Sequence, residues 1–225
     1  MFKLLLATML ATVAGTASAQ LDKISNQDAT SGLQAALEKG SQVAVANLGK
    51  PDGFFRNGAV KIPLPDSLKR YEKLMRNVGM GKYADELILT MNRAAEAAVP
   101  EAKALLVDAV KKMTVQDAKG ILTGGNTAGT EYFKRTTSEP LRGKFLPIVS
   151  QATKKVKLAD KYNEYAAKGA QFGLVKKEDA NLDSFVTQKA LDGLFFMVAE
   201  EEKKIRENPV KAGSEILKKV FGALK

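Results

Sequence analysis

The chain has 225 residues and contains no cysteine and no histidine, and its 35 lysines and arginines against 25 aspartates and glutamates give a formal net charge of +10. The missing residue types exclude disulfides, thiol nucleophiles, Ser-His-Asp triads and metal sites built on imidazole or thiolate. Carboxylate, lysine or tyrosine chemistry, or carboxylate-bound calcium or magnesium, stays open. We predict no cofactor and no metal site.

The first nineteen residues have the pattern of a secretory signal peptide. Lys3 precedes an apolar run from Leu4 to Val13, and Ala17 and Ala19 form an Ala-x-Ala cleavage site. The run is too short for a membrane-spanning helix, and no later run approaches the required length. We therefore expect cleavage before Gln20 and a soluble mature protein in the periplasm.

The mature chain keeps a strong positive charge. Removal of Lys3 leaves 34 basic against 25 acidic residues, a net charge of +9. An exported basic protein meets anionic phospholipid headgroups and lipopolysaccharide instead of nucleic acid. Anionic lipid or a membrane surface is therefore the expected partner, nucleic acid is not expected, and the sequence names no protein partner.

Helical periodicity extends over nearly all of the mature chain. The predicted helices span residues 28–48, 66–78, 82–98, 126–136, 138–167 with a kink at Pro147, 182–207 and 209–221, and a capping box at Thr114 to Asp117 opens one more. Glycine and proline gather near residues 54–65, which suits at most a short edge hairpin or extended segment. No repeat or linker divides the chain, so we predict an all-α fold, a single-domain multi-helix bundle over residues 20–225.

Helix ends are predicted from capping residues. Asp28 or Thr30 is the expected cap of the first helix, whose apolar face carries Leu33, Leu37, Ala44 and Leu48. Asp66 is the expected cap of the next helix, which carries Leu68, Tyr71, Leu74, Met75 and Val78.

The helix over 182–207 contains acids among apolar residues. From Ala190 to Val198 only Asp192 is polar, and a helix that is apolar all round is a buried central helix. On a helical wheel Asp192 lies beside the Phe185 and Phe196 edge.

Three consecutive glutamates follow. Glu201 falls within the main apolar stripe of the wheel, while Glu200 and Glu202 point to its flanks. A buried carboxylate needs a partner. Asp192 and Glu201 therefore either pair with arginine or backbone amides, or line a ligand pocket. Their axial offset of about 13.5 Å is too long for a glycosidase pair.

A second candidate group is Asn92, Arg93 and Glu96. Arg93 and Glu96 lie three residues apart, opposite the apolar face of their helix, and could form a solvated ion pair. Alternatively, the three residues face another helix and supply the partner that Asp192 or Glu201 needs. The spacing does not choose between these interpretations.

A third candidate is a helix start near residue 126. The glycines of ILTGGNTAGTEYFKRTT do not form a phosphate loop, because no strand precedes them and the Gly-Lys-Ser/Thr ending is missing. We expect Gly124 to end one helix in a left-handed conformation and Asn126 to cap the next. The amides of that start form a candidate anion site, with residues Asn126, Thr127, Lys134 and Arg135.

The segment from Asp179 to Asp183 copies half of a calcium loop. Ser184 replaces the glycine at loop position six and Ala190 replaces the glutamate at position twelve. Helix capping is the better interpretation of this segment.

The runs VKIPLPDSL, MNRAAEAAVPEAKALLVDAVKKMTVQDAKGILTGGNTAGTEYF, FLPIV and VTQKALDGLFFMVAEEEKKIRENPVKAGSEILKKVFG occur in this order. They resemble the family of exported bacterial proteins catalogued as domain of unknown function 4197. The resemblance implies a helical periplasmic protein of a Gram-negative-type cell and implies no activity. Relatives carry Asp-Thr-Ala-Ala-Thr where this chain has Asn126 to Thr130, which puts a metal-binding or catalytic acid there in doubt.

Two classes of function follow. The favoured one is a non-enzymatic binding protein that docks on an anionic membrane surface or holds an apolar or anionic ligand between helices. The predicted helix over 209–221, with apolar residues opposite lysines, is the candidate membrane surface, although such a helix more often packs on the core. The alternative is a hydrolase that uses Asp192 and Glu201. A structural or partner-binding envelope protein is the remaining possibility.

Overall fold

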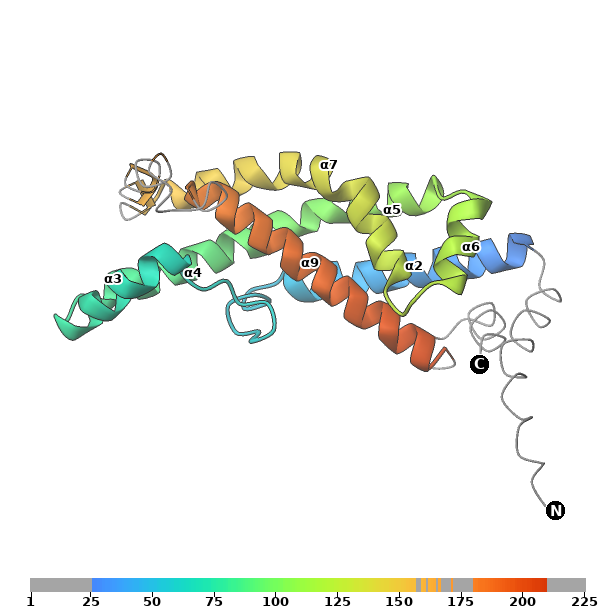
Figure 1. Ribbon diagram of the computed structural model, residues 1–225, viewed down its shortest axis with the longest axis horizontal. Helices are drawn as coiled ribbons and strands as arrows, with labels where there is room; N and C mark the ends of the chain where they lie inside the picture. The colour runs from blue at the N-terminus through green and yellow to red at the C-terminus, as the bar shows by residue number, and fades with distance from the viewer. Residues whose placement is uncertain are drawn as a thin grey trace, which may run out of the picture.

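The computed structural model describes residues 26–156 and 180–209 and, between them, residues 159, 160, 162–164, 166 and 171. The described residues form seven α-helices, one 3₁₀ helix and no strand (Figure 1). The all-α prediction is therefore confirmed. The predicted signal segment, residues 1–19, and the predicted terminal helix beyond Pro209 lie outside the described residues. The elements are α2 (Asn26–Leu48), α3 (Asp66–Asn77), α4 (Gly81–Ala98), η1 (Val99–Glu101), α5 (Ala102–Lys111), α6 (Val115–Thr123), α7 (Ala128–Thr153) and α9 (Leu182–Glu207).

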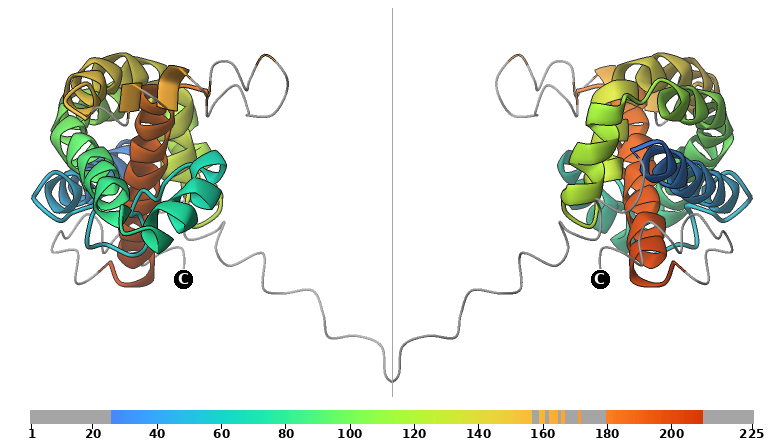
Figure 2. Two further views of the ribbon diagram at one scale, coloured as in Figure 1. Left: turned by 90° about the vertical axis from the view of Figure 1, so that its left-hand side faces the viewer. Right: turned by 90° about the vertical axis from the view of Figure 1, so that its right-hand side faces the viewer.

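Helix α9 is the central helix. It crosses the middle of the molecule in both end-on views (Figure 2) and packs against α2, α4 and α7. Its bounds agree with the predicted helix over 182–207. The Asn181 Oδ1 atom accepts a hydrogen bond from the Ser184 N–H at 3.0 Å, which confirms the capping interpretation of the segment from Asp179. Most of its circumference is buried, at residues Leu182, Phe185, Val186, Thr187, Ala190, Leu191, Gly193, Leu194, Phe195, Val198, Glu202 and Ile205.

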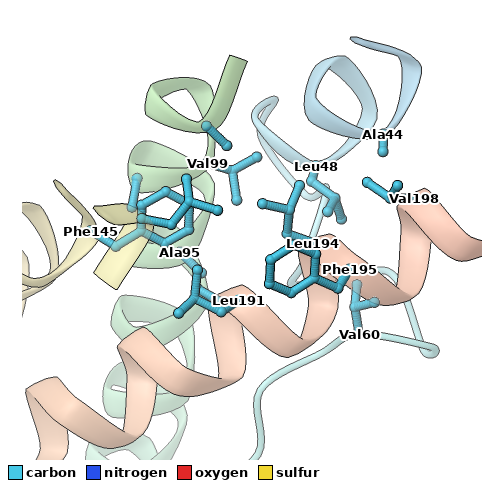
Figure 3. Packing of buried hydrophobic residues seen from close by; sticks show 14 of the residues in the cluster. Ala44, Leu48, Val60, Ala95, Val99, Phe145, Leu191, Leu194, Phe195 and Val198 are labelled. Atoms are coloured by element: carbon cyan, nitrogen blue, oxygen red, sulfur yellow. The ribbon is translucent and has the colours of Figure 1, made fainter. Parts of the chain in front are cut away.

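One apolar core joins all these elements. Figure 3 shows α9 side chains meeting Leu48 of α2, Ala95 of α4, Val99 of η1 and Phe145 of α7. Leu194 and Phe145 are fully buried. Each large apolar side chain removed from water stabilises the fold by about 2 kcal/mol, so this core is the main source of stability in a chain without disulfides.

The first described helix has the predicted buried face. Leu33, Leu37, Ala44 and Leu48 are all buried. The helix begins at Asn26, however, so the expected caps Asp28 and Thr30 lie inside its first turns. Similarly, α3 begins at Asp66 after Pro65, and Asp66 is a first-turn acid and not the cap. A first-turn carboxylate still stabilises the helix through its dipole.

The chain between α6 and α7 differs from the prediction in detail. The capping box of Thr114 and Asp117 is present and opens α6. Gly124 is extended, with φ −82° and ψ −177°, and is not left-handed. The residue before α7 is Thr127, not Asn126, and its side chain makes no capping bond.

Helix α7 is one continuous helix from Ala128 to Thr153, without the predicted break after residue 136. It ends before the predicted residue 167, but the described residues between 159 and 166 are again helical. Pro140 and Pro147 both lie inside it. Each proline removes one backbone hydrogen bond. The buried side chains of Leu141, Phe145 and Val149, four residues apart, hold the helix against the core and offset that cost.

The segment between α2 and α3 forms turns and an extended stretch, and no strand. Phe54 and Ile62 anchor it, with 0% and 1% of their surface exposed. Phe54 lies directly on α9, because a Cβ atom added at Gly193 would be 2.6 Å from the Phe54 Cε1 atom. A glycine is therefore required where this loop, residues 49–65, crosses the central helix.

Candidate functional site

Asn92 binds the 49–65 loop from within the core. Its Oδ1 atom accepts from the Ile62 N–H at 2.8 Å, and its Nδ2 atom donates to the Ile62 carbonyl at 2.9 Å and to the Ile88 carbonyl at 2.8 Å. One buried side chain thus satisfies both backbone groups of Ile62, as a neighbouring strand would. This explains how the extended segment is stable without a β partner.

Glu96 binds the same loop one turn further along α4. Its Oε1 atom accepts from the N–H groups of Phe54 and Phe55, both at 3.0 Å, and its Oε2 atom accepts from Arg93 at 2.6 Å. Arg93 also donates to Asp52 at 2.7 Å, and these two carboxylates raise the pKa of Arg93. The partners of Asn92, Arg93 and Glu96 are therefore loop residues and one another, not Asp192 or Glu201.

Glu202 is the buried carboxylate of α9. It accepts from the Gly129 N–H at 3.0 Å, and from the N–H and hydroxyl of Thr130 at 2.8 and 2.9 Å. Arg206 donates two further bonds to it, at 3.0 and 2.8 Å. Helix starts attract anions, and here the anion is the protein's own side chain. The amides of Gly129 and Thr130 in the predicted anion site are thus already bonded.

A groove of 560 Å³ lies between α7 and α9. Its α7 wall carries mostly polar and charged side chains, and its α9 wall carries apolar residues beside Gln188 and Asp192. Leu191 and Phe195 are buried beneath it, and Phe196 is 44% exposed at its edge. The lining residues are Thr127, Glu131, Lys134, Ser138, Arg142, Gln188, Leu191, Asp192, Phe195, Phe196 and Ala199.

A hydrogen-bonded chain crosses the groove from one helix to the other. Arg142 donates a hydrogen bond to the Gln188 Oε1 atom, and the Gln188 Nε2 atom donates to Asp192 at 2.7 Å. Lys134 pairs with Glu131 at 2.8 Å on the α7 wall. Arg142 also forms a long ion pair with Glu139 of the same helix, at 3.9 Å. Because this pair is long and Gln188 is neutral, Arg142 keeps N–H donors that can bind an anion at the groove.

The family described as protein of unknown function (DUF4197) matches the chain over residues 23–222. The chain belongs to this family. The match covers the described helices and confirms the resemblance found in the sequence. Neither the curated proteins nor the solved structures gave a match.

In this DUF4197 protein, three of the predicted site residues border the groove. Asp192 comes from the candidate pair of buried acids, and Thr127 and Lys134 come from the candidate anion site at the helix start. The Asp192 side chain is 53% exposed. The fold therefore brings together residues that the sequence presented as separate candidates.

The remaining predicted residues lie elsewhere in the DUF4197 fold. Asn126 is exposed in the turn before α7. Arg135 stacks on the Tyr132 ring at 5.5 Å and pairs with Asp117 at 3.5 Å. Glu201 pairs with Lys204 at 2.8 Å, and its side chain is 14% exposed beside Gly40 of α2. Asp192 and Glu201 therefore do not share a site.

Sequence reasoning missed Glu202, Arg142 and Gln188. The signal for Glu202 is present in the sequence, because Arg206 follows it by four residues and Ile205 and Val198 flank it on one helix face. No sequence pattern predicts the hydrogen bond between Arg142 and Gln188, because it depends on how α7 crosses α9.

Among the residues that the model describes, no three acids lie close enough to hold a metal ion. The described helices also include none with a long enough apolar stretch to cross a bilayer.

Proposed function

We propose that this DUF4197 chain is a non-enzymatic binding protein of the periplasm, exported by its first nineteen residues, that holds an amphipathic ligand with an anionic head in the groove between α7 and α9. The observation that carries the proposal is the position of the half-exposed Phe196 in the same groove as Arg142. An exposed aromatic ring beside an incompletely paired guanidinium offers both contacts that such a ligand needs.

The apolar part of the ligand would lie along α9. Phe196 offers a ring face, and Leu191 and Phe195 provide an apolar floor that is already fixed by the core. A site whose floor does not rearrange binds with less loss of conformational entropy.

The anionic head of the ligand would meet Arg142. A guanidinium binds carboxylate or phosphate through two parallel hydrogen bonds. Gln188 orients the guanidinium from the other helix and in turn bonds to Asp192. Asp192 thus has a role in positioning Arg142 and does not need to touch the ligand.

The hydrolase alternative required Asp192 and Glu201 in one cleft. Only Asp192 borders the groove, while Glu201 faces α2 and Lys204. The positions of these two acids therefore favour binding over that hydrolysis.

A fluorescent twelve-carbon fatty acid tests the proposal by direct titration. We expect Arg142→Gln to weaken binding about tenfold, the loss of one charge-assisted contact, and Phe196→Ser to weaken it to a similar extent. Arg142→Lys should recover part of the affinity. The matched uncharged alcohol should bind less tightly and should not respond to Arg142→Gln.

Val115→Ser is the matched control, because Val115 is 48% exposed on α6, outside the groove. Its affinity for the fatty acid should equal that of the unchanged chain. Equal affinities for all variants would place any binding outside the groove. Native mass spectrometry of protein purified from its own periplasm gives an independent readout, in which a bound small anion or lipid supports the proposal and a ligand-free mass opposes it.

A further inference from the structure

The turn between α3 and α4 carries an unusual amount of exposed apolar surface. Among the described residues eight large apolar side chains are exposed, and four of them fall within residues 73–83, the hairpin tip. Their exposed fractions are 55% for Leu74, 70% for Val78, 47% for Met80 and 42% for Tyr83. Figure 1 shows α3 and the start of α4 at one end of the molecule, and none of residues 73–83 lines the groove between α7 and α9.

The geometry of the tip is fixed by the chain itself. Gly79 adopts φ +76°, a left-handed conformation that favours glycine, and the Met80 N–H donates to the Met75 carbonyl at 2.7 Å. Arg76 pairs with Glu72 at 2.8 Å and with Asp85 at 2.5 Å, and so ties α3 to α4. Val78 and Met80 are therefore held at the apex by a well-formed turn.

The tip also presents two lysines. Residues 73–83 contain Lys73, Arg76 and Lys82, and Arg76 is already paired with Glu72 and Asp85, so Lys73 and Lys82 are the cations that can meet an anionic surface. The Lys82 ammonium lies 5.1 Å from the centre of the Tyr83 ring, and Lys73 is exposed on α3. Apolar side chains at an apex with cations beside them match the boundary of an anionic bilayer, where hydrocarbon lies just below charged headgroups.

We propose that the hairpin tip docks on the surface of an anionic lipid bilayer, with Val78 and Met80 at the headgroup boundary and Lys73 and Lys82 on the lipid phosphates. This surface is separate from the ligand groove and goes beyond the proposed function. It also differs from the predicted membrane surface at 209–221, which lies outside the described residues.

Two observations favour a bilayer over a protein partner. The tip is a projecting end, and four half-exposed side chains supply well under the roughly 800 Å² that a stable protein interface buries on each partner. A second copy of the chain would bring Lys73 and Lys82 of two tips together, and like charges oppose such contact. A bilayer instead accepts a small convex apolar apex and supplies the opposite charge.

Sedimentation with vesicles tests the proposal. We expect the purified chain to bind vesicles of equimolar phosphatidylcholine and phosphatidylglycerol, not vesicles of phosphatidylcholine alone, and to be released as salt rises from about 0.1 M to about 1 M. Val78→Asp combined with Met80→Asp should abolish binding. Removal of one base, by Lys73→Gln or Lys82→Gln, should weaken binding about fivefold.

Controls are available on the same chain. Val115→Asp places an acid on an apolar site of α6 that is as exposed as Met80, and Lys144→Gln removes an exposed base on α7. Both variants should bind vesicles almost as the unchanged chain does. Equal binding by the tip variants and the controls would overturn the proposal. Dimerisation that depends on protein concentration and is removed by Val78→Asp would also overturn the proposal, because the tip would then be a contact between two copies of the chain.

The absence of cysteine allows a second readout that does not depend on binding strength. Val78→Cys and Val115→Cys can each be labelled at one site with a polarity-sensitive dye. Anionic vesicles should shift the emission of the Val78→Cys label toward that of an apolar environment and leave the Val115→Cys label unchanged. A shift at residue 115 alone would refute docking through the tip.

Discussion

The Glu202 carboxylate accepts a hydrogen bond from the Thr130 backbone amide at 2.8 Å, across 72 positions of sequence. The amide belongs to the first turn of α7 and the carboxylate to the last turns of α9. Since Thr127 makes no side-chain capping bond, α9 supplies the cap that α7 lacks. Formation of the α7 start is therefore linked to the docking of α9.

The first prediction concerns Glu202. Glu202→Ala leaves Arg206 and the amides of Gly129 and Thr130 without their acceptor in a buried position. We expect the free energy of unfolding to fall by about 3 kcal/mol. Urea unfolding followed by circular dichroism measures the loss.

The neighbouring acid provides the control for this prediction. Glu201 pairs with the exposed Lys204, so Glu201→Ala should change the free energy of unfolding by about 0.5 kcal/mol or less. Equal losses in the two variants would contradict the role of Glu202 as the capping carboxylate.

The second prediction concerns the contact between Gly193 and Phe54. Gly193→Ala would place a methyl group 2.6 Å from the Phe54 ring, so we expect a loss of about 2 kcal/mol in the free energy of unfolding. Phe54→Leu in the same chain should recover part of this loss, because the shorter side chain leaves room. Thermal and urea unfolding of the two variants measure both effects.

Gly143 is the matched control. It lies inside α7 with no other group within 4 Å of an added Cβ atom. Gly143→Ala should stabilise the protein by about 0.7 kcal/mol through helix propensity. A neutral Gly193→Ala would mean that the 49–65 loop does not rest on α9.

The third prediction concerns acid sensitivity at the start of α6. Hydrogen bonds from the Thr114 hydroxyl and amide hold the pKa of Asp117 below its usual value, and Arg135 lowers it further. A depressed pKa in the folded state means that Asp117 stabilises the fold above its unfolded pKa of about 3.9. This contribution is lost as the pH falls through the folded-state pKa.

Comparison with Asp117→Asn isolates this effect. The unchanged chain should exceed the variant by about 1 kcal/mol in free energy of unfolding near neutral pH. The difference should hold down to about pH 4 and vanish below the folded-state pKa. Urea unfolding across this pH range measures it, and a difference that grew on acidification would contradict the assignment.

Helices could be predicted from the sequence because apolar residues recur with helical spacing along almost every segment. Helix ends were harder. The cap of α6 is local, and the Thr114 and Asp117 pattern predicted it. The cap of α7 comes from Glu202, far along the chain, so local capping rules pointed to Asn126 instead.

The choice among three consecutive glutamates shows the same limit. Glu201 and Glu202 follow Val198 by three and four residues, and both spacings suit one helix face. Which of them is buried depends on where the start of α7 lies, and sequence spacing contains no such information. The same reason explains why Asp192, Thr127 and Lys134 could be nominated singly but not as neighbours in one groove.

The loop contacts of α4 could be predicted only in part. Asn92 and Glu96 were recognised as candidates beside Arg93, because Arg93 and Glu96 have the spacing of an ion pair opposite the apolar face of their helix. Their partners are backbone groups of Ile62, Phe54 and Phe55, and backbone groups carry no sequence signal. The sequence therefore identified Asn92 and Glu96 but not the backbone groups that they bind.

The central position of α9 sets the order in which the molecule can be completed during synthesis. A growing chain that ends before Leu182 has made α2, α4 and α7 but not the helix that all three contact. The parts of their apolar faces that pack on α9, and the amides of Gly129 and Thr130, then lack these partners. The core therefore cannot be completed until the last quarter of the chain, which contains α9, is available.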